Sequence, residues 1–425
     1  MQPQHESLKR AIGTFGLAAG IVNITIGGGI FRLPALVASS LGAATPIAYV
    51  ICAIAMGLIV VCIADAGKRV TLTGGPYAYV GAAFGPYVGF ISGVLLWMLG
   101  TFATAAVSTV LVASLGSLMP SLSGGAIATA LLIAAFVFWS AINLFGVTLS
   151  VRLNTIATVA KLFPLVLIAA AGAFFVRSEN FQVTTMPAGG DIARTSLILI
   201  FAFAGIESAL IPSGEVRDSE RTVPRAIALA MLGITTLYIA LQMVAQGILG
   251  SGLAQSTASP LADAAGASLG GWARSLLLVG ASISMFGYLG GMTLSMPRVV
   301  YALARDRFLP AALAQIHPVH RSPQAAIIFQ AILTLVLAIT GTFEKLAILA
   351  NVSALALYFG CAAASWKLSH RPIVPLLACA VIAWLLTGLT LDEWLGFGAC
   401  LVVASIAYRL RMLQATPAAA ADRHQ

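Results

Sequence analysis

Charged residues are scarce in this sequence. Asp, Glu, Lys and Arg make up 9% of its 425 residues, whereas a soluble globular domain carries roughly 25%. Apolar residues account for 60% of the chain, and the mean hydropathy is +0.98. So few charges cannot cover an exterior that faces water. The composition therefore predicts a membrane protein whose outer surface contacts the lipid bilayer.

The sequence also lacks the residue groups of catalytic and metal sites. Its five histidines fall in predicted tails or loops, and its five cysteines lie singly inside apolar segments without CxxC spacing. No HExxH motif and no pairing of a nucleophile with a base occurs within an apolar segment. We therefore expect no enzyme activity, no metal site and no cofactor. We interpret the cysteines as small apolar core residues.

Basic residues exceed acidic ones, giving a net charge of +9, but they form no stripe with interleaved aromatic residues. This pattern argues against nucleic acid as a partner. With the N-terminus placed inside, 17 of the 23 Lys and Arg residues fall in cytoplasmic segments and 5 in outer segments, while Lys161 lies within a span. The bias predicts a multi-pass protein of the bacterial inner (cytoplasmic) membrane with both termini in the cytoplasm.

Apolar runs long enough to cross a bilayer, about 20 residues each, occur about twelve times. The first follows Lys9 and Arg10, as a signal peptide would, but it continues to about Val37 and more spans follow, so we expect a transmembrane helix. The predicted spans are 12–37, 43–64, 87–115, 124–146, 154–176, 194–212, 225–250, 272–298, 324–342, 346–366, 373–390 and 394–408.

The spans divide into two blocks of five followed by a pair. Because five is odd, the blocks insert with opposite orientation, and glycine interrupts the opening span of each, at Gly27-Gly28-Gly29 and at Gly205. Interrupted helices at matching positions of inverted repeats indicate the binding site of a transporter. We expect an all-α polytopic membrane protein with a 5+5 inverted repeat and with helices 1 and 6 broken. Its expected parts are a cytoplasmic N-terminus (1–10), the first repeat (11–176), the second repeat (194–366), helices 11 and 12 (373–410) and a disordered cytoplasmic tail (411–425).

The three consecutive glycines lie in the middle of the first span, where glycine destabilises a helix. An unwound backbone at this point would offer free N–H groups to a carboxylate, provided that it lines a protected cavity. The alternative is close helix packing, which glycine also permits. We favour the binding site.

Three motifs, in order along the chain, resemble a known family. The stretch Gly27-Gly28-Gly29-Ile30-Phe31 is similar to the first-helix signature of the amino acid–polyamine–organocation superfamily. Residues 73–80, followed by Phe84-Gly85-Pro86, are similar to the family's loop between helices two and three. Residues 201–207, with 214–225, are similar to its sixth helix and the loop that follows. Hydropathy agrees with the family over essentially the whole chain.

The resemblance implies a substrate site at the two broken helices. Gly27, Gly28 and Gly29, preceded by Ile26, would face the carboxylate of an amino acid, and carbonyl groups of the sixth helix would receive its ammonium. Gly28 departs from the family, where serine is frequent, so the backbone alone would hold the carboxylate. The sixth-helix residues are Phe201, Ala202, Phe203, Ala204 and Gly205. The resemblance also places Trp97, Thr104 and Met292 in the side-chain pocket.

Lys161 is an unusual residue for its position, because an ammonium inside a span costs roughly 2.5–3.5 kcal/mol or more. It should face the bundle interior and pair with backbone carbonyls or a carboxylate. The resemblance implies a tethered replacement for a bound sodium ion. A group that releases a proton during the cycle and a lysine that extends to the inner headgroups are the alternatives.

Glu207 and Phe203 carry weaker predictions. Glu207 is the second intramembrane charge and needs a partner; it either stabilises the broken helix or takes up a proton during the cycle. Phe203 either closes over the substrate as an aromatic gate or packs in the bundle.

Secondary transport of an amino acid is the function that these features favour. Because no acidic residue falls among the candidate lining residues, we expect a neutral substrate rather than arginine or a polyamine. Proton symport and exchange both remain open, as do the oligomeric state and the identity of the amino acid. The rivals are a membrane-embedded proton-translocating subunit, which needs a longer chain of buried charges, and a carrier of cationic amino acids.

Overall fold

The computed structural model describes residues 13–70, 76–122, 125–145, 161–183, 186–205, 218–317 and 322–421. Within these ranges the chain is helical and has no strand, which confirms the all-α class. Each predicted span overlaps a helix, and seven helices of the described residues are long and apolar enough to cross a membrane. The number of crossings and the inverted repeat stay predictions.

The helices follow one another in chain order as α1 (Thr14–Thr25), α2 (Gly29–Leu41), α3 (Thr45–Arg69), α4 (Pro76–Phe84), α5 (Pro86–Leu118), α6 (Gly125–Phe145), an apolar helix Lys161–Phe175, α8 (Gly189–Phe203), α10 (Ser219–Leu249), α11 (Pro260–Leu269), α12 (Gly271–Arg305), α13 (Gln324–Thr340), α14 (Phe343–Ser369), α15 (Ile373–Leu386) and α16 (Leu391–Ala421).

The first predicted span is broken at the glycines. α1 ends at Thr25, the backbone bends over residues 26–28, and α2 begins at Gly29. The sixth predicted span ends as a helix at Phe203: Ala204 is extended and Gly205 has a φ of +118°, a conformation that glycine adopts readily. Residues 206–217 follow outside the described ranges, and Glu207 lies among them.

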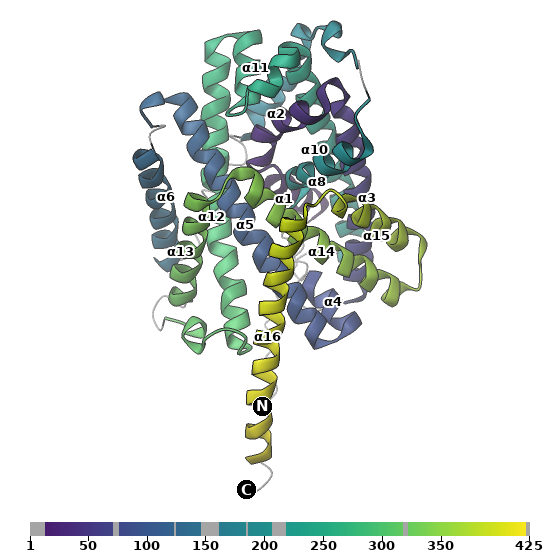
Figure 1. The fold of residues 1–425 in the computed structure, drawn as a ribbon, viewed down its shortest axis with the longest axis vertical. Coiled ribbons are helices and arrows are strands. Elements are labelled where there is room, and N and C mark those ends of the chain that lie inside the picture. Colours follow the sequence, from purple (N-terminus) through teal and green to yellow (C-terminus); the bar gives the residue numbers. More distant parts are fainter. Residues whose placement is uncertain are drawn as a thin grey trace.

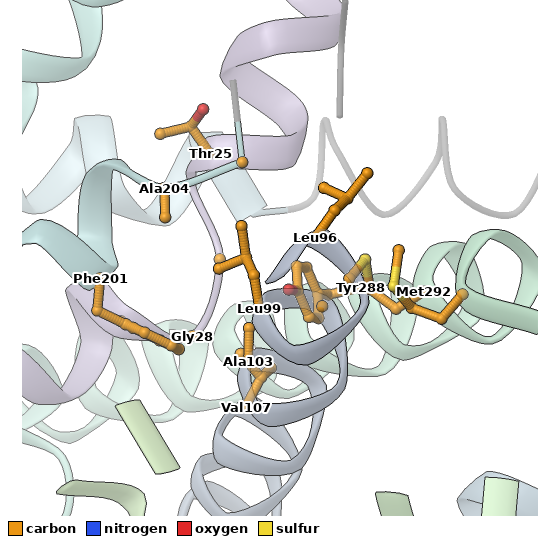
Figure 2. Close-up of a pocket in the computed structure, with 15 residues that line it drawn as sticks. Thr25, Gly28, Leu96, Leu99, Ala103, Val107, Phe201, Ala204, Tyr288 and Met292 are labelled. Carbon is orange, nitrogen blue, oxygen red and sulfur yellow. The ribbon is translucent and has the colours of Figure 1, made fainter. Parts of the chain in front are cut away.

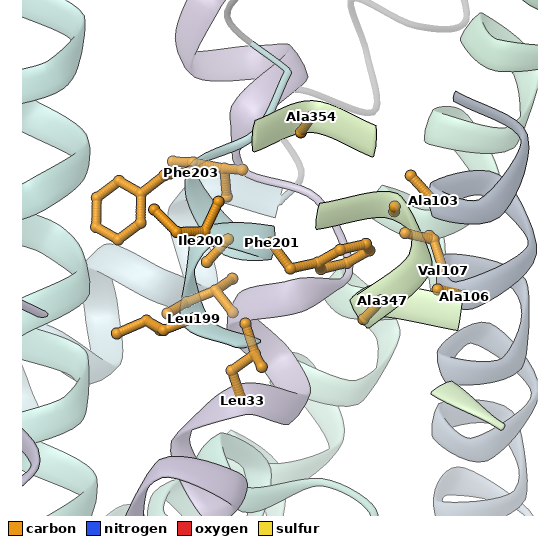
Figure 3. Close-up of a cluster of buried hydrophobic side chains, with 14 of the residues drawn as sticks. Leu33, Ala103, Ala106, Val107, Leu199, Ile200, Phe201, Phe203, Ala347 and Ala354 are labelled. Carbon is orange, nitrogen blue, oxygen red and sulfur yellow. The ribbon is translucent and has the colours of Figure 1, made fainter. Parts of the chain in front are cut away.

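The two breaks lie side by side in the bundle. α1 contacts α10, α2 contacts α8, and α5 runs between α12 and α14 (Figure 1). Buried side chains from α2, α5, α8 and α14 fill the space next to the breaks (Figure 3). This packing places the start of α2 and the end of α8, where backbone groups lack partners within the helix, against the middle of α5. The candidate functional site lies there.

The last turns of α3 and α14, which carry Lys68, Arg69 and Lys367, lie near each other and near α4. Ser365 donates to Asp65 at 3.1 Å, and Lys367 lies 5.0 Å from the ring centre of Phe84 at the end of α4. These helix ends carry basic residues assigned to the cytoplasm. Which end of the bundle faces the cytoplasm stays a prediction.

Four helices extend beyond the spans predicted for them. α16 is helical as far as Ala421, whereas residues 411–425 were expected to be disordered. The long apolar run before Arg409 explains why a helix that starts at Leu391 can propagate into the alanine-rich tail. α5, α10 and α12, with 33, 31 and 35 residues, exceed the length that a span needs, in agreement with their long apolar runs.

Candidate functional site

A small cavity lies where the two breaks face α5 and α12. Its volume is about 40 Å³, enough for about three water molecules. Figure 2 shows Gly28 and Phe201 on one side and side chains of α5 and α12 on the other. Among the described residues, the lining consists of Thr25, Gly27, Gly28, Gly29, Leu96, Leu99, Gly100, Ala103, Val107, Phe201, Ala204, Gly205, Tyr288, Met292 and Met296.

The start of α2 forms one end of the cavity. The first N–H groups of a helix have no acceptor within the helix, and they lie at the positive end of its dipole. Glycine permits the close packing here: a Cβ on Gly28 would lie 3.1 Å from Val107 Cγ1, and one on Gly29 would lie 3.0 Å from Phe201 Cδ1, both tighter than ordinary van der Waals contact. Val107 therefore occupies the space that a serine at position 28 would need.

A hydroxyl group is present at this end even though Gly28 lacks one. Thr25, the last residue of α1, lines the cavity and is 2% exposed. Within the described part of the chain its Oγ1 has no hydrogen-bond partner. A buried hydroxyl without a partner is costly unless a ligand or water supplies one. Thr25 is thus a candidate donor or acceptor for the substrate.

The end of α8 forms the opposite end of the cavity. The last carbonyl groups of a helix lack intrahelical donors and lie at the negative end of its dipole. Phe201, Ala204 and Gly205 line the cavity, while Ala202 is buried beside them. The cavity thus lies between a helix end that favours an anion and a helix end that favours a cation.

Tyr238 of α10 connects the two breaks. Its hydroxyl lies 2.9 Å from the carbonyl oxygen of Ala202 and 3.2 Å from that of Thr25. A phenol has one proton to donate, so it serves one carbonyl at a time or shares the proton between them. The side chain is fully buried, so the contact fixes the spacing of α1 and α8 without water.

Lys161 contacts the first break directly. Its Nζ lies 2.8 Å from the carbonyl oxygen of Ile26, and the side chain is 4% exposed. Among the charged side chains of the described ranges, Lys161 alone is buried. The hydrogen bond places a positive charge against the unwound backbone. The expectation that Lys161 faces the interior and meets a backbone carbonyl agrees with this geometry, while its role in transport stays a prediction.

The side wall of the cavity is apolar. α5 supplies Leu96, Leu99, Ala103 and Val107, and α12 supplies Tyr288 and two methionines. No lining residue in the described part of the chain is charged. A charged substrate side chain would therefore have no counter-ion in this wall.

Several predicted residues lie elsewhere. Phe203 is fully buried and packs edge-on against Tyr238, with ring centres 5.3 Å apart, so Phe201 and not Phe203 lines the cavity. Figure 3 shows the two rings leaving α8 in opposite directions. Trp97 lies outside the cavity and donates from Nε1 to Gln330 at 2.7 Å. Thr104 faces a second, smaller cavity.

Met292 separates the two cavities. The second cavity, about 10 Å³ in volume, is lined by Met292 together with Thr104, Thr293, Gln330 and Thr334. Two of these side chains are joined, because Gln330 Nε2 lies 3.0 Å from Thr334 Oγ1, while Thr104 donates to the carbonyl oxygen of Gly100 at 2.6 Å. Of the three residues predicted for the side-chain pocket, Met292 alone borders the main cavity.

Sequence reasoning missed Thr25, Tyr238, Tyr288 and the α5 wall. The wall had a signal: Leu96, Leu99, Gly100, Ala103 and Val107 recur at helical spacing and share one face. Tyr238 had none, since a tyrosine in an apolar run is ordinary. No group of His, Cys, Asp and Glu in the described residues could hold a metal ion.

Comparisons with known proteins agree with this geometry. A sequence profile of the family described as "Amino acid permease" matches residues 12–392. The serine/threonine exchanger SteT of Bacillus subtilis is 29% identical over 364 residues, covering 81% of this chain and 80% of the relative. The branched-chain amino acid permease BcaP of the same organism is 27% identical over 83% of this chain and 79% of the relative. An arginine/agmatine antiporter of Chlamydia abortus is 28% identical over 86% and 79%.

Proposed function

Because this chain belongs to the amino acid permease family, whose members are multi-pass membrane transporters and not enzymes, we propose that it carries neutral amino acids with apolar side chains by alternating access. The membrane is proposed to be the bacterial cytoplasmic membrane. The observation that carries the proposal is a cavity between the start of α2 and the end of α8 whose described lining residues include no charged side chain.

The main chain is proposed to bind the parts that all amino acids share. The substrate carboxylate lies at Gly27, Gly28 and Gly29, where the first N–H groups of α2 and the helix dipole favour an anion. The N–H of Gly27 itself already donates to the carbonyl oxygen of Thr25 at 2.8 Å, so Gly28 and Gly29 are the proposed donors. The substrate ammonium lies at the carbonyl groups that end α8. The separation of positive and negative helix ends across one small cavity supports this orientation.

The wall of α5 and α12 is proposed to bind the substrate side chain. The named relatives differ in cargo: a serine/threonine exchanger, a branched-chain amino acid permease and an arginine/agmatine antiporter. An arginine side chain needs a carboxylate or a set of acceptors, and the described lining contains no acidic residue. Leucine, alanine, valine and methionine side chains match an aliphatic substrate instead.

Transport is proposed to be independent of sodium. The ammonium of Lys161 meets the carbonyl oxygen of Ile26 at 2.8 Å, so a positive charge is already tethered at the unwound backbone. Two coupling modes are compatible with a tethered charge: obligatory exchange, and proton symport in which Lys161 or Glu207 titrates. In both, a bundle formed by α1, α2, α3, α8 and α10 rocks against the remaining helices and exposes the cavity to each side in turn.

The test is uptake of a radiolabelled amino-acid panel into proteoliposomes, empty or preloaded, with and without an inward proton gradient. Sodium-independent uptake of neutral aliphatic amino acids supports the proposal, and uptake restricted to arginine contradicts the substrate class. Uptake only into preloaded vesicles would identify an exchanger. Accumulation in empty vesicles driven by the gradient would identify a proton symporter.

A further inference from the structure

A larger cavity lies away from the substrate site, between α3, α10 and α15. Its volume is about 780 Å³. The cavity opens on the apolar outer surface, where Val61 is 53% exposed and Ile373 is 73% exposed. Gly57 and Val61 of α3, Ala228 and Met231 of α10, and Val374 of α15 line its apolar part. We refer to this cavity as the α3–α15 groove.

Basic side chains lie at one end of the groove, and two of them, Lys68 and Arg371, are charged. Lys68 comes from the last turn of α3, and His370 and Arg371 come from the connection between α14 and α15. α15 begins at Ile373, which also lines the groove, so the positive end of this helix dipole lies at the same place. Basic side chains and a helix start thus meet the end of an apolar channel.

The acidic residue of the groove is already engaged. Asp65 accepts a hydrogen bond from Ser365 Oγ at 3.1 Å and lies 3.8 Å from Arg69 Nε. Within the described ranges, neither Lys68 nor Arg371 has a carboxylate within ion-pair distance. The charges at the mouth of the groove are therefore uncompensated by the described chain.

These features fit one class of ligand. An amphipathic molecule with apolar chains and an anionic head would fill the channel and neutralise the mouth, as basic pockets between transmembrane helices do for anionic lipids. A second copy of this chain would bring its own Lys68 and Arg371 and would add like charge. We infer that the α3–α15 groove binds a phospholipid with an anionic headgroup, its phosphate at Lys68 and Arg371 and its acyl chains along Gly57 and Met231.

The site has a consequence for the transport cycle. α3 and α10 belong to the helices proposed to rock, whereas α15 does not. A lipid held between them contacts both the moving and the stationary part, so its binding depends on the conformational state. The inference itself stands on the groove alone and does not require the transport proposal.

Native mass spectrometry of the purified full chain tests the inference. The protein in detergent is titrated with phosphatidylglycerol and, separately, with phosphatidylcholine of the same acyl chains. We expect one phosphatidylglycerol to be retained at concentrations at which phosphatidylcholine is not. The double variant Lys68→Gln/Arg371→Gln should weaken phosphatidylglycerol binding about 25-fold, since each basic residue near a lipid headgroup contributes roughly fivefold, and should leave phosphatidylcholine binding unchanged.

A second variant probes the apolar part of the groove. A Cβ at Gly57 would meet no atom within 4 Å, so a side chain can leave the backbone of α3 here, and Gly57→Phe is directed into the groove that Gly57 lines. Replacing glycine also favours the helix. This variant should lose lipid of both kinds. If it does not fold, Ala228→Trp on the opposite side of the groove replaces it. The control is Arg305→Gln/Arg409→Gln, which removes the same charge from exposed positions outside the groove lining and should retain phosphatidylglycerol binding.

Four results would overturn the inference. Equal retention of the two lipids would remove the headgroup preference. If the control Arg305→Gln/Arg409→Gln lost as much phosphatidylglycerol binding as Lys68→Gln/Arg371→Gln, the loss would be due to the overall charge of the protein and not to the groove. Full retention in both groove-filling variants would place the lipid elsewhere. A dimer mass that Gly57→Phe abolishes would make the groove an interface between copies.

Discussion

The ends of the substrate cavity and its side wall are built from different parts of the chain. The ends are backbone groups of α2 and α8, held in place by Lys161 and Tyr238. The wall consists of side chains of α5 and α12. Amino acids share a carboxylate and an ammonium but differ in their side chains. Changes at the ends should therefore reduce transport of all substrates alike, whereas changes in the wall should alter the choice among them.

The largest effect is expected for Lys161→Ala. A hydrogen bond from a charged group contributes roughly 1.5–3 kcal/mol, so loss of the contact with Ile26 should lower the uptake of every substrate about 10- to 150-fold. Proteoliposome uptake of the amino-acid panel measures this. Lys161→Arg keeps the charge and should retain more activity than alanine. Wild-type uptake by the alanine variant would remove Lys161 from the mechanism, and a loss confined to some substrates would break the distinction between ends and wall.

The second effect concerns the glycine at the start of α2. Gly28→Ala places a methyl group 3.1 Å from Val107 Cγ1, and overpacking of this kind costs roughly 1–3 kcal/mol. Uptake of all substrates should fall about tenfold or more. Val107→Ala removes the crowded methyl groups, so the double variant Gly28→Ala/Val107→Ala should recover much of the lost uptake. Absence of recovery, with normal folding by gel filtration, would show that the Gly28 backbone acts independently of Val107.

A smaller and equally general effect is expected for Tyr238→Phe. The hydroxyl bridges the carbonyl groups of Thr25 and Ala202, and a neutral hydrogen bond contributes roughly 0.5–1.5 kcal/mol. Uptake should fall about 2- to 12-fold for each substrate. Tyr49→Phe is the matched control. Tyr49 is also fully buried, and its hydroxyl donates to Gln242 Oε1 in a hydrogen bond of 3.0 Å; neither residue lines the cavity. Equal losses in the two variants would mean that Tyr238 acts on bundle stability alone.

The sequence predicted the parts of this site that depend on local chemistry. Three glycines inside a span signal a break wherever the span packs, and an ammonium inside a span must find a partner. The identity of that partner was not predictable, because Ile26 and Lys161 are 135 residues apart and meet only through tertiary packing. The same holds for Tyr238, whose contacts depend on where α8 ends.

The predicted residues that do not line the cavity differ from those that do in side-chain direction. Phe201 and Phe203 are two residues apart on α8, which turns their rings to nearly opposite sides of a helix, and only packing decides which ring faces the cavity. Trp97 and Thr104 lie on α5, as do Leu96 and Val107, but on a face turned toward α13. A motif locates the helix that forms a site more reliably than it locates the face.

Met292 offers the sharpest test of the wall, with a small effect on overall rate. It lies between the main cavity and the smaller one at Thr104 and Gln330, whose lining mixes polar side chains with apolar ones such as Phe136 and Ile327. Met292→Ala should join the two, so that longer or polar side chains such as glutamine gain relative to alanine. A change of one methylene in an apolar pocket is worth roughly 1–3 kcal/mol, so the uptake ratio should shift about tenfold. Competition of radiolabelled alanine by glutamine measures the ratio.

Met285→Ala is the control for this prediction, because Met285 is a nearby methionine outside the cavity lining, and it should leave the ratio unchanged. A uniform loss for both substrates in Met292→Ala would show that this part of the wall acts as the ends do.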